Sequence, residues 1–171
     1  MYTYDVNDNL TAKTSKATGE QTVYTYDAEN QLIRVEQFSP AGGTTPVLVA
    51  EYRYDALGRR IEKVVNGVST RFVYNNEDIV AEVDGTGATQ ATILHGPGID
   101  EPLAVNRSGV RGGPFTYHAD GLGSITTVTD ALGDPALTYT YDSFGRIVDE
   151  TGTVIDPYTY TGREFDPETG L

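Results

Sequence analysis

The sequence has no cysteine and no tryptophan, and it is poor in positive charge. Without thiols, disulfide scaffolds and thiolate metal sites are excluded. Lysine and arginine number 12 against 25 aspartates and glutamates, which gives a formal net charge of −13. Binding to nucleic acid or to an anionic membrane needs clustered cations, so this composition argues against both.

Long apolar runs are also missing. The longest purely aliphatic stretch covers only residues 47–50, whereas a membrane-spanning helix needs about 20 apolar residues and a signal peptide about 7–15. An apolar 3.6-residue period does not persist for three turns anywhere in the chain, so we expect no substantial helix and no membrane insertion. An export signal, if one exists, is expected outside this chain.

Paired aromatic residues are what the sequence has in abundance. All 12 tyrosines lie in aromatic-x-Tyr pairs, whose second members are Tyr4, Tyr26, Tyr54, Tyr74, Tyr117, Tyr141 and Tyr160. These second members follow one another at intervals of 22, 28, 20, 43, 24 and 19 residues, and residues 92–95 stand where a degenerate copy would divide the longest interval. A spacing of two places both rings on one face of a strand but on different sides of a helix. The pairs therefore predict strands.

Turn sequences follow several of the pairs. Residues 27–30, 55–58 and 142–145 each begin with Asp and end with Asn or Gly. Aspartate stabilises a turn by accepting hydrogen bonds from nearby backbone amides, while Gly and Asn tolerate the left-handed conformation that closes it. A second β-branched stretch then begins, as in residues 32–35 and 60–64. Each unit is thus predicted to be a β-hairpin.

Seven or eight such hairpins imply about fourteen strands, more than a flat open sheet accommodates without curling or splitting. We therefore predict an all-β fold, a curved spiral ribbon of antiparallel β-hairpins in which each repeat contacts mainly its neighbours. Residues 41–45 and 107–114 are expected to be loops. The residues expected to maintain the repeat are Tyr4, Asp5, Tyr26, Asp27, Tyr54, Asp55, Gly58, Arg59, Tyr141, Asp142, Gly145 and Arg146.

The sequence resembles the YD (RHS) repeat family. Residues 24–27 read YTYD, residues 52–61 read YRYDALGRRI and residues 139–147 read YTYDSFGRI. Residues 94–103, 117–124 and 160–171 resemble, in the right order, the RHS repeat-associated core. We therefore expect one array in residues 1–171, with YD repeats in residues 1–91 and the associated core in residues 92–171.

The resemblance implies a bacterial protein that is secreted or displayed at the cell surface. In such proteins the repeats wind into a hollow β-shell around a C-terminal toxin domain, as in effectors of interbacterial competition and the shell component of insecticidal toxin complexes. The expected partners are such a toxin domain and neighbouring repeats of a longer chain. The expected function is therefore that of a structural shell segment.

The resemblance also implies a catalytic aspartate, because many members release the toxin by aspartyl self-cleavage at paired DPxG motifs. Asp166 matches one half of that pair, in residues 166–170. The second motif does not occur within residues 1–171. Aspartyl proteolysis needs two carboxylates that share a proton. Asp156 is followed by Pro157 but lacks the required Gly, so it does not replace the partner. We expect Asp166 to open a turn and the chain not to be an enzyme.

Metal and cofactor sites are not expected. The only histidines, His95 and His118, are each expected in a Gly-rich turn, and both, together with carboxylates such as Asp100 or Asp120, would be needed to bind a metal. Residues 84–87 and 120–123 are only faintly similar to calcium loops, because they lack acidic ligands at alternating positions. We therefore interpret both histidines as structural.

Two other functions remain open. Edge strands around residues 2–4 and 158–160 could pair between copies, which would make the chain a self-assembling, filament-forming extracellular subunit. Rows of tyrosine on one sheet face could instead stack against sugar rings, although such rows more often serve cross-strand packing. The acid excess is also uneven, because residues 74–171 carry 4 basic and 16 acidic side chains. This excess of acid favours a role in solubility, and the alternative is a surface that faces a cationic partner.

Overall fold

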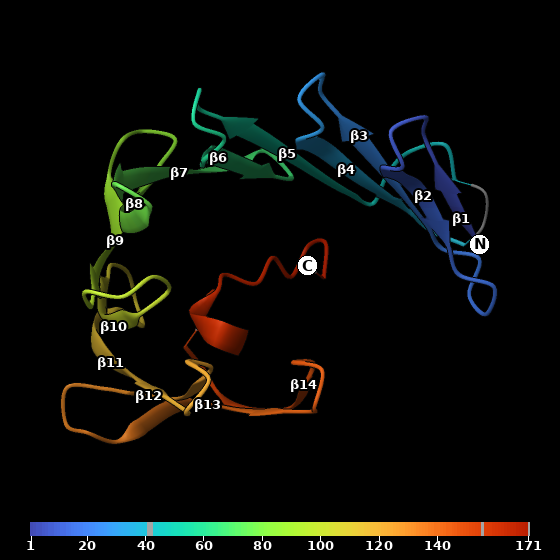
Figure 1. The fold of residues 1–171 in the computed structure, drawn as a ribbon. Coiled ribbons are helices and arrows are strands. Elements are labelled where there is room, and N and C mark those ends of the chain that lie inside the picture. Colours follow the sequence, from blue (N-terminus) through green and yellow to red (C-terminus); the bar gives the residue numbers. More distant parts are fainter. Residues whose placement is uncertain (41–42, 155, 171) are drawn as a thin grey trace. The chain divides into compact units, whose positions relative to one another are not determined.

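The structure is a computed structural model that describes residues 1–40, 43–154 and 156–170. In these ranges the chain forms fourteen β-strands and one short 3₁₀ turn, η1 (Tyr160–Gly162), and no α-helix (Figure 1). The strands are β1 (Tyr2–Tyr4), β2 (Leu10–Thr14), β3 (Gln21–Tyr26), β4 (Leu32–Phe38), β5 (Leu48–Tyr54), β6 (Arg60–Val65), β7 (Val68–Asn75), β8 (Asp78–Asp84), β9 (Thr89–His95), β10 (Pro102–Arg107), β11 (Gly113–Ala119), β12 (Ile125–Thr129), β13 (Pro135–Tyr141) and β14 (Ile147–Gly152).

The strand order in the sheet is the order in the sequence, from β1 to β14, and the described registers are antiparallel. Short turns make this arrangement the simplest one available, since a strand that ends in a tight turn pairs at once with its successor. The prediction of an all-β fold of antiparallel hairpins is confirmed. Two compact units divide the chain, residues 1–71 and residues 72–171, and each is described by itself. The boundary expected after residue 91 stays a prediction.

The turns owe their shape to one recurring aspartate. In the turn between β5 and β6, Asp55 Oδ1 accepts hydrogen bonds from the amides of Leu57 (2.9 Å) and Arg59 (3.0 Å). Gly58 has a φ of +81° there, which a residue with a Cβ adopts only at a cost. The Arg59 guanidinium contacts Asp55 Oδ2 at 2.6 Å. The same paired amide contacts recur at Asp5, Asp27 and Asp142, and also at Asp84, Asp120 and Asp130.

A β-bulge accompanies the second tyrosine of the clearest pairs. The register shifts between Thr25 and Tyr26, between Arg53 and Tyr54, and between Thr140 and Tyr141. The first ring of each of these pairs is buried, whereas the second is half-buried near the turn. A bulge turns the strand and re-aims the side chain that follows it. This explains why the two rings of a pair are not equally covered.

The core of residues 1–71 is small and lies on one face of β3–β5. Tyr24, Val35, Ala50 and Tyr52 are buried together, and the Arg60 guanidinium lies 5.3 Å from the centre of the Tyr52 ring. On the opposite face, cross-strand ion pairs join Arg34 to Glu51 and Glu62 to both Arg53 and Arg71. One face is therefore apolar and aromatic, and the other is charged.

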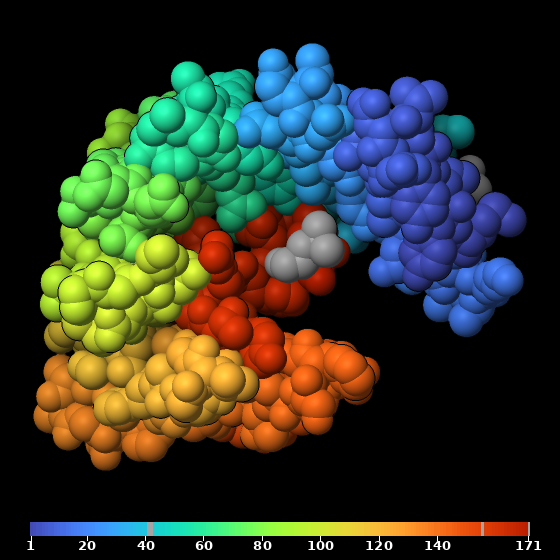
Figure 2. Space-filling view, viewed as in Figure 1, coloured from blue at the N-terminus to red at the C-terminus, as the bar shows by residue number. Residues whose placement is uncertain are grey.

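Residues 72–171 have a larger core. Val105, Ile125, Val128 and Leu137 are the most enclosed aliphatic side chains of this unit, and they pack with buried aromatics of β7, β11 and β13 and with Tyr158. The C-terminal segment, defined here as residues 153–154 and 156–170, lies against the strands of its own unit (red in Figure 2). The backbone of Ile125 donates to the Thr159 carbonyl at 2.9 Å, and the amide of Thr161 donates to Ser124 Oγ at 3.1 Å.

Some local predictions need correction. Residues 158–160 do not form a strand of the sheet: Tyr158 makes an isolated bridge with Glu164, and Tyr160 begins η1. This segment packs against Ser124 and Ile125 instead of pairing with the last strand of the sheet. The loop expected over residues 107–114 is shorter, since β10 reaches Arg107 and β11 begins at Gly113. Residues 41–42 of the other expected loop lie outside the described residues, and residues 43–45 belong to no strand.

Candidate functional site: a buried carboxylate beneath the C-terminal segment

Asp156 holds the C-terminal segment to the sheet. Its side chain has no exposed surface. The Tyr117 hydroxyl donates to Asp156 Oδ2 at 2.7 Å, and the Arg107 guanidinium contacts the same oxygen at 3.2 Å. The amide of Tyr158 donates to the other carboxylate oxygen at 3.0 Å. Strands β10 and β11 thus supply the groups that bind an acid located in a different part of the chain.

A second carboxylate completes the cluster. Arg107 lies between Asp156 and Glu82, whose Oε2 is 3.3 Å from the arginine. The side chains of Arg107 and Glu82 are only 16% and 11% exposed. The cluster therefore contains two acids and one base in a largely dry environment, where an unpaired charge is costly.

The electrostatics of this cluster follow from burial and charge. Burial raises the pKa of Asp156, while Arg107 and the Tyr117 hydrogen bond act against that rise. Burial lowers the pKa of Arg107, but Asp156 and Glu82 together outweigh it, so the net pKa of Arg107 is raised. Burial, followed by the charge of Asp156, also raises the pKa of Tyr117. The phenol consequently stays protonated and acts as a donor.

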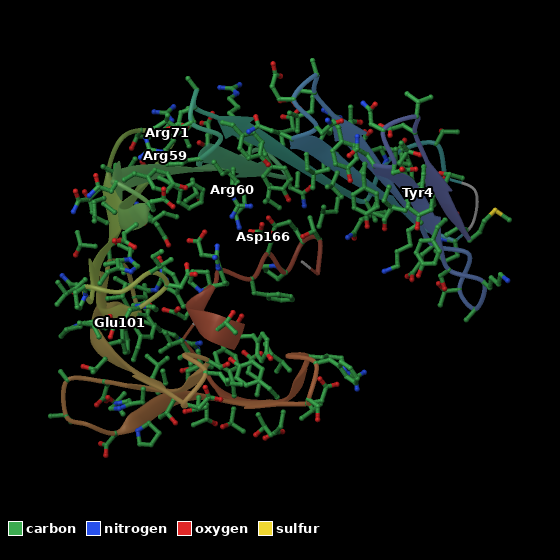
Figure 3. All side chains as sticks on the ribbon, viewed as in Figure 1. Tyr4, Arg59, Arg60, Arg71, Glu101 and Asp166 are labelled. Carbon is green, nitrogen blue, oxygen red and sulfur yellow. The ribbon has the colours of Figure 1, made fainter. Side chains whose placement is uncertain are left out.

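The geometry around Asp156 favours a structural role for this carboxylate over proton transfer. Both oxygens of Asp156 already accept hydrogen bonds from protein groups, and the neighbouring acid, Glu82, contacts the same arginine through a different nitrogen. An aspartyl dyad instead needs two carboxylates in direct contact. Asp166 begins a turn in the C-terminal segment, where the amides of Thr169 and Gly170 donate to its carbonyl oxygen at 3.0 and 2.8 Å (Figure 3). Its suggested catalytic role stays a prediction.

The repeat residues expected from the sequence do not gather at one site. They lie at successive turns: Asp5, Asp27, Asp55 and Asp142 cap separate turns. Tyr26, Tyr54 and Tyr141 are half-buried. Gly145 also admits the Tyr160 ring, since a Cβ there would come within 2.5 Å of it. Arg146 contacts Asp142 Oδ2 at 3.0 Å, as Arg59 does Asp55.

Tyr4 differs from the other repeat tyrosines. It lies on β1 and is 59% exposed (Figure 3). Its partner in the pair, Tyr2, is 58% exposed. The first aromatic pair is therefore on the surface of its unit, in contrast to the buried rings of the later pairs.

The two histidines lie on strands rather than in turns, and each contacts the protein. His95 ends β9 and its Nε2 is 3.0 Å from the Ile79 carbonyl oxygen. His118 lies on β11 with its Nε2 3.0 Å from Thr129 Oγ1. Asp100 pairs with Arg163 at 2.8 Å, and Asp120 caps a turn. Among residues 1–40, 43–154 and 156–170, no group of three or more His, Asp or Glu side chains is arranged to hold a metal ion.

The sequence did not reveal the cluster around Asp156. A weak signal was present, because Arg107 ends a strand of mainly small and aliphatic residues and Glu82 lies within another. Arg107 and Asp156 are separated by 49 residues, so no local pattern joins them. Within the described part of the chain, there is also no helix of the length and apolarity needed to cross a membrane.

Comparisons with known proteins place this architecture in a family. Residues 43–171 match the family described as Teneurin YD-shell, and residues 4–45 match the RHS Repeat family. The tRNA nuclease WapA of Bacillus subtilis strain 168 is 31% identical over 98% of this chain. Toxin protein Tse5 of Pseudomonas aeruginosa is 30% identical over 99% of it. The chain spans only 7% of WapA and 15% of Tse5.

Solved structures share the fold. A structure of the Photorhabdus luminescens Tc holotoxin pore superposes with a TM-score of 0.62, 14% identity and coverage of 98% of this chain and 11% of the compared chain. A complex of TcdB2, TccC3 and Cdc42 gives a TM-score of 0.53 at 16% identity, covering 86% of this chain and 9% of that one. The resemblance to YD (RHS) repeats is confirmed, and the chain belongs to the Teneurin YD-shell family.

Proposed function

We propose that this chain is a section of the wall of a secreted bacterial RHS-type shell, which in the longer protein encloses a C-terminal toxin domain. The observation that carries the proposal is the strand order: every strand from β1 to β14 follows its sequence neighbour in the sheet. Such a ribbon lengthens by adding hairpins without rearranging those already present. This is the property that a wall of repeats requires.

The relatives support a role in a toxin. Two of them carry the names tRNA nuclease and toxin protein, and this chain spans a small part of each. A third, Double-stranded DNA deaminase toxin A of Burkholderia cenocepacia, is 28% identical over 99% of this chain, which spans 14% of it. A nuclease and a deaminase catalyse different reactions, whereas the part of each relative that matches this chain is the β-ribbon. We infer that the wall is common to them and that catalysis belongs to other parts of those proteins.

In this proposal Asp156 has a structural role. Fastened by Arg107 and Tyr117, it keeps the C-terminal segment against the sheet of its own unit. The chain that follows residue 170 would thereby leave the sheet from a fixed place. We propose the partners to be neighbouring repeats and an enclosed toxin domain, and we propose export through a signal elsewhere in the protein.

The test uses the full-length protein that contains this chain. The coding sequence beyond residue 171 should continue into a second DPxG motif and a further domain, and a stop codon directly after residue 171 would contradict the proposal. Limited proteolysis then compares that further domain in the full-length protein with the same domain expressed alone. Enclosure predicts slow cleavage in the full-length protein. Equal cleavage rates would show that the wall encloses nothing.

Self-assembly is the second candidate. It is favoured by the edge strand β1, which is only three residues long and presents Tyr2 and Tyr4 to solvent. Unpaired edges are templates for another chain. Negative-stain microscopy of the purified chain would reveal rings or filaments, and a uniform population of monomers would remove this candidate.

Carbohydrate binding is a weaker candidate, because Tyr24, Tyr52, Tyr117 and Tyr139 are buried. A glycan array without binding would dispose of it.

A further inference from the structure

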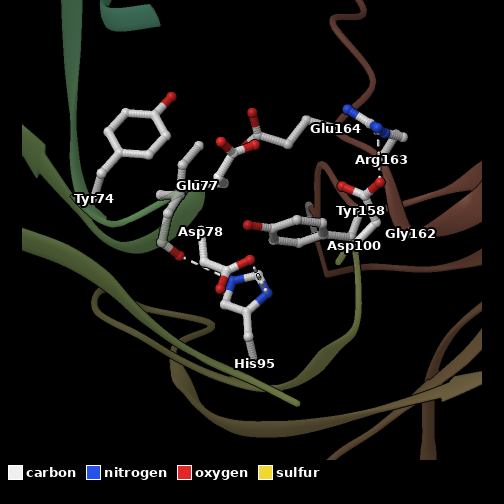
Figure 4. Close-up of a pocket in the computed structure, with 10 residues that line it drawn as sticks. Tyr74, Glu77, Asp78, His95, Asp100, Tyr158, Gly162, Arg163 and Glu164 are labelled. Atoms are coloured by element: carbon white, nitrogen blue, oxygen red, sulfur yellow. Dashed lines mark hydrogen bonds and ion pairs between the residues drawn. The ribbon is translucent and has the colours of Figure 1, made fainter. Parts of the chain in front are cut away.

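Beside the C-terminal segment lies a small pocket with an unusual lining. Its volume is about 180 Å³, and its walls come from β7, β8, the end of β9 and the segment itself (Figure 4). Two aromatic side chains, Tyr74 and Tyr158, are among the residues that line it (Figure 4). The pocket belongs entirely to residues 72–171 and does not include Asp156.

The lining is strongly acidic. Glu77, Asp78, Asp100 and Glu164 contribute four carboxylates, and Arg163 is the single arginine or lysine among the lining residues. That arginine already pairs with Asp100, with 2.8 Å between Arg163 Nη2 and Asp100 Oδ2. The lining therefore has three more acidic side chains than arginine or lysine side chains. Acidic side chains alone do not define a binding site, because they are commonly solvated.

His95 supplies an independent indication. Its side chain is only 8% exposed, and its Nε2 lies 3.0 Å from the Ile79 carbonyl oxygen. A carbonyl only accepts, so Nε2 carries the proton and, in the neutral ring, Nδ1 presents a lone pair. Nδ1 is buried and has no hydrogen-bond partner. A buried acceptor left in this state costs free energy, which a donor would recover.

The nearest carboxylate to His95 Nδ1, that of Asp78, indicates where such a donor would bind. Asp78 Oδ1 is 3.8 Å from His95 Nδ1, too far for a hydrogen bond. One nitrogen with two N–H bonds could lie about 2.9 Å from each of these two atoms. Nδ1 is closed to solvent, but the Asp78 side chain is 32% exposed, so its carboxylate can rotate outward to admit such a group. The pocket therefore offers two acceptors to a single donor.

The chemistry of the ligand follows from what the pocket contains. The described residues hold no metal-binding arrangement, and hydrated metal ions would not use the aromatic walls. An alkylammonium group would use every part of the lining: its N–H bonds reach His95 and Asp78, its charge balances the carboxylates, and its carbon chain packs against Tyr74 and Tyr158. We propose that this pocket binds a primary ammonium group carried on a short alkyl chain, as in a lysine side chain or a free amine. This proposal does not depend on enclosure of a toxin.

The test is a titration of the 171-residue chain with n-butylamine, followed by NMR of the ¹⁵N-labelled histidine rings. We expect a saturable change in the Nδ1 signal of His95, with a dissociation constant of about 1–10 mM, and no such change at His118. Butan-1-ol has similar length but no charge and should leave the signals unchanged. N-acetyl-lysine methylamide forms the second arm: tighter binding than n-butylamine would identify a protein lysine as the source, and weaker binding a free amine.

Matched variants make the result specific. Asp78→Asn keeps an acceptor oxygen but removes its charge, and should weaken n-butylamine binding about tenfold, because charge-assisted hydrogen bonds are about twice as strong as neutral ones. Glu77→Gln should weaken it less, since Glu77 is exposed. Asp149→Asn makes the same charge change at an exposed position of β14 and should have no effect. Binding that leaves Nδ1 unchanged, or that Asp149→Asn weakens as much as Asp78→Asn, would overturn the proposal.

Discussion

Replacing Arg107 with methionine would leave two acids in the core without their base. Methionine keeps most of the length of the arginine side chain and none of its charge. The Asp156 side chain has no exposed surface and the Glu82 side chain is 11% exposed, so neither carboxylate can turn to water without moving the groups around it. Removing one partner of a buried ion pair typically costs about 3–5 kcal/mol. We expect Arg107→Met to lower the free energy of unfolding of residues 72–171 by about this amount at pH 7.

The loss should depend on pH with a definite sign. Burial already raises the pKa of Asp156 above its ordinary value of 3.8, and Arg107 opposes that rise. Without Arg107 the pKa of Asp156 moves further up, so the folded variant holds this proton more tightly than the unfolded chain. The stability that this one group contributes is then fully present below pH 3.8 and is lost as pH rises through its folded pKa. Its deficit relative to the unsubstituted chain should therefore grow from acid to neutral pH.

Guanidinium chloride unfolding, followed by far-ultraviolet circular dichroism at several pH values between 4 and 8, measures this deficit. Arg111→Met removes the same charge from an exposed arginine whose guanidinium donates to the Thr153 carbonyl at 3.3 Å, and should cost no more than about 0.5 kcal/mol. In the double variant Arg107→Met/Asp156→Asn, the stranded acid is gone, and we expect about 2 kcal/mol of the loss to return. A deficit below about 1 kcal/mol, or one that is constant with pH, would refute the reasoning.

Three further predictions concern packing and turns. Tyr54→Ala should cost about 3 kcal/mol in denaturant melts, because the half-buried ring is lost together with its hydrogen bond to Leu32, whereas the exposed Thr25→Ala should cost about 0.5 kcal/mol or less. Equal losses would mean that the two faces are wrongly assigned. Gly162→Ala should expose the C-terminal segment to proteolysis, because a Cβ would lie 2.2 Å from the Asp100 carbonyl oxygen. Asp55 has a lowered pKa through its contacts with Arg59, so its stabilising effect should disappear as pH falls through and below 3.8, and Asp55→Asn should flatten that part of a pH titration of stability.

Two of these predictions have direct controls. Gly87→Ala changes a turn glycine that has no atom within 4 Å of its added Cβ, so it measures the backbone cost alone, and unchanged proteolysis of Gly162→Ala relative to it would contradict the close contact. For the acid titration, Asp149→Asn removes a carboxylate that lies exposed on β14 and should leave the titration curve unchanged.

The sequence by itself determined the hairpins. Aromatic pairs two residues apart, each followed by an aspartate turn, specify strand, turn and strand within about ten residues, because these preferences come from neighbouring atoms. Even so, the pattern does not predict the turns at Asp84, Asp120 and Asp130, which have the same aspartate-capped structure. Their carboxylates bind backbone amides in the same way as Asp55 does. The aromatic pairs predict only some of these turns, because the strands before Asp84 and Asp130 contain no aromatic residue.

Only the tertiary structure decided what lies on the sheet. Residues 158–160 carry the same aromatic spacing as a repeat strand, yet they leave the sheet, because Asp156 is held by Arg107 and Tyr117 at sequence separations of 49 and 39 residues. The burial of His95 depends in the same way on Tyr158, whose ring meets it edge-on at 5.9 Å. Local patterns specify which way a side chain points along its own strand. Which distant segment covers it depends on the packing of complete surfaces, and a periodicity within one strand carries no information about that choice.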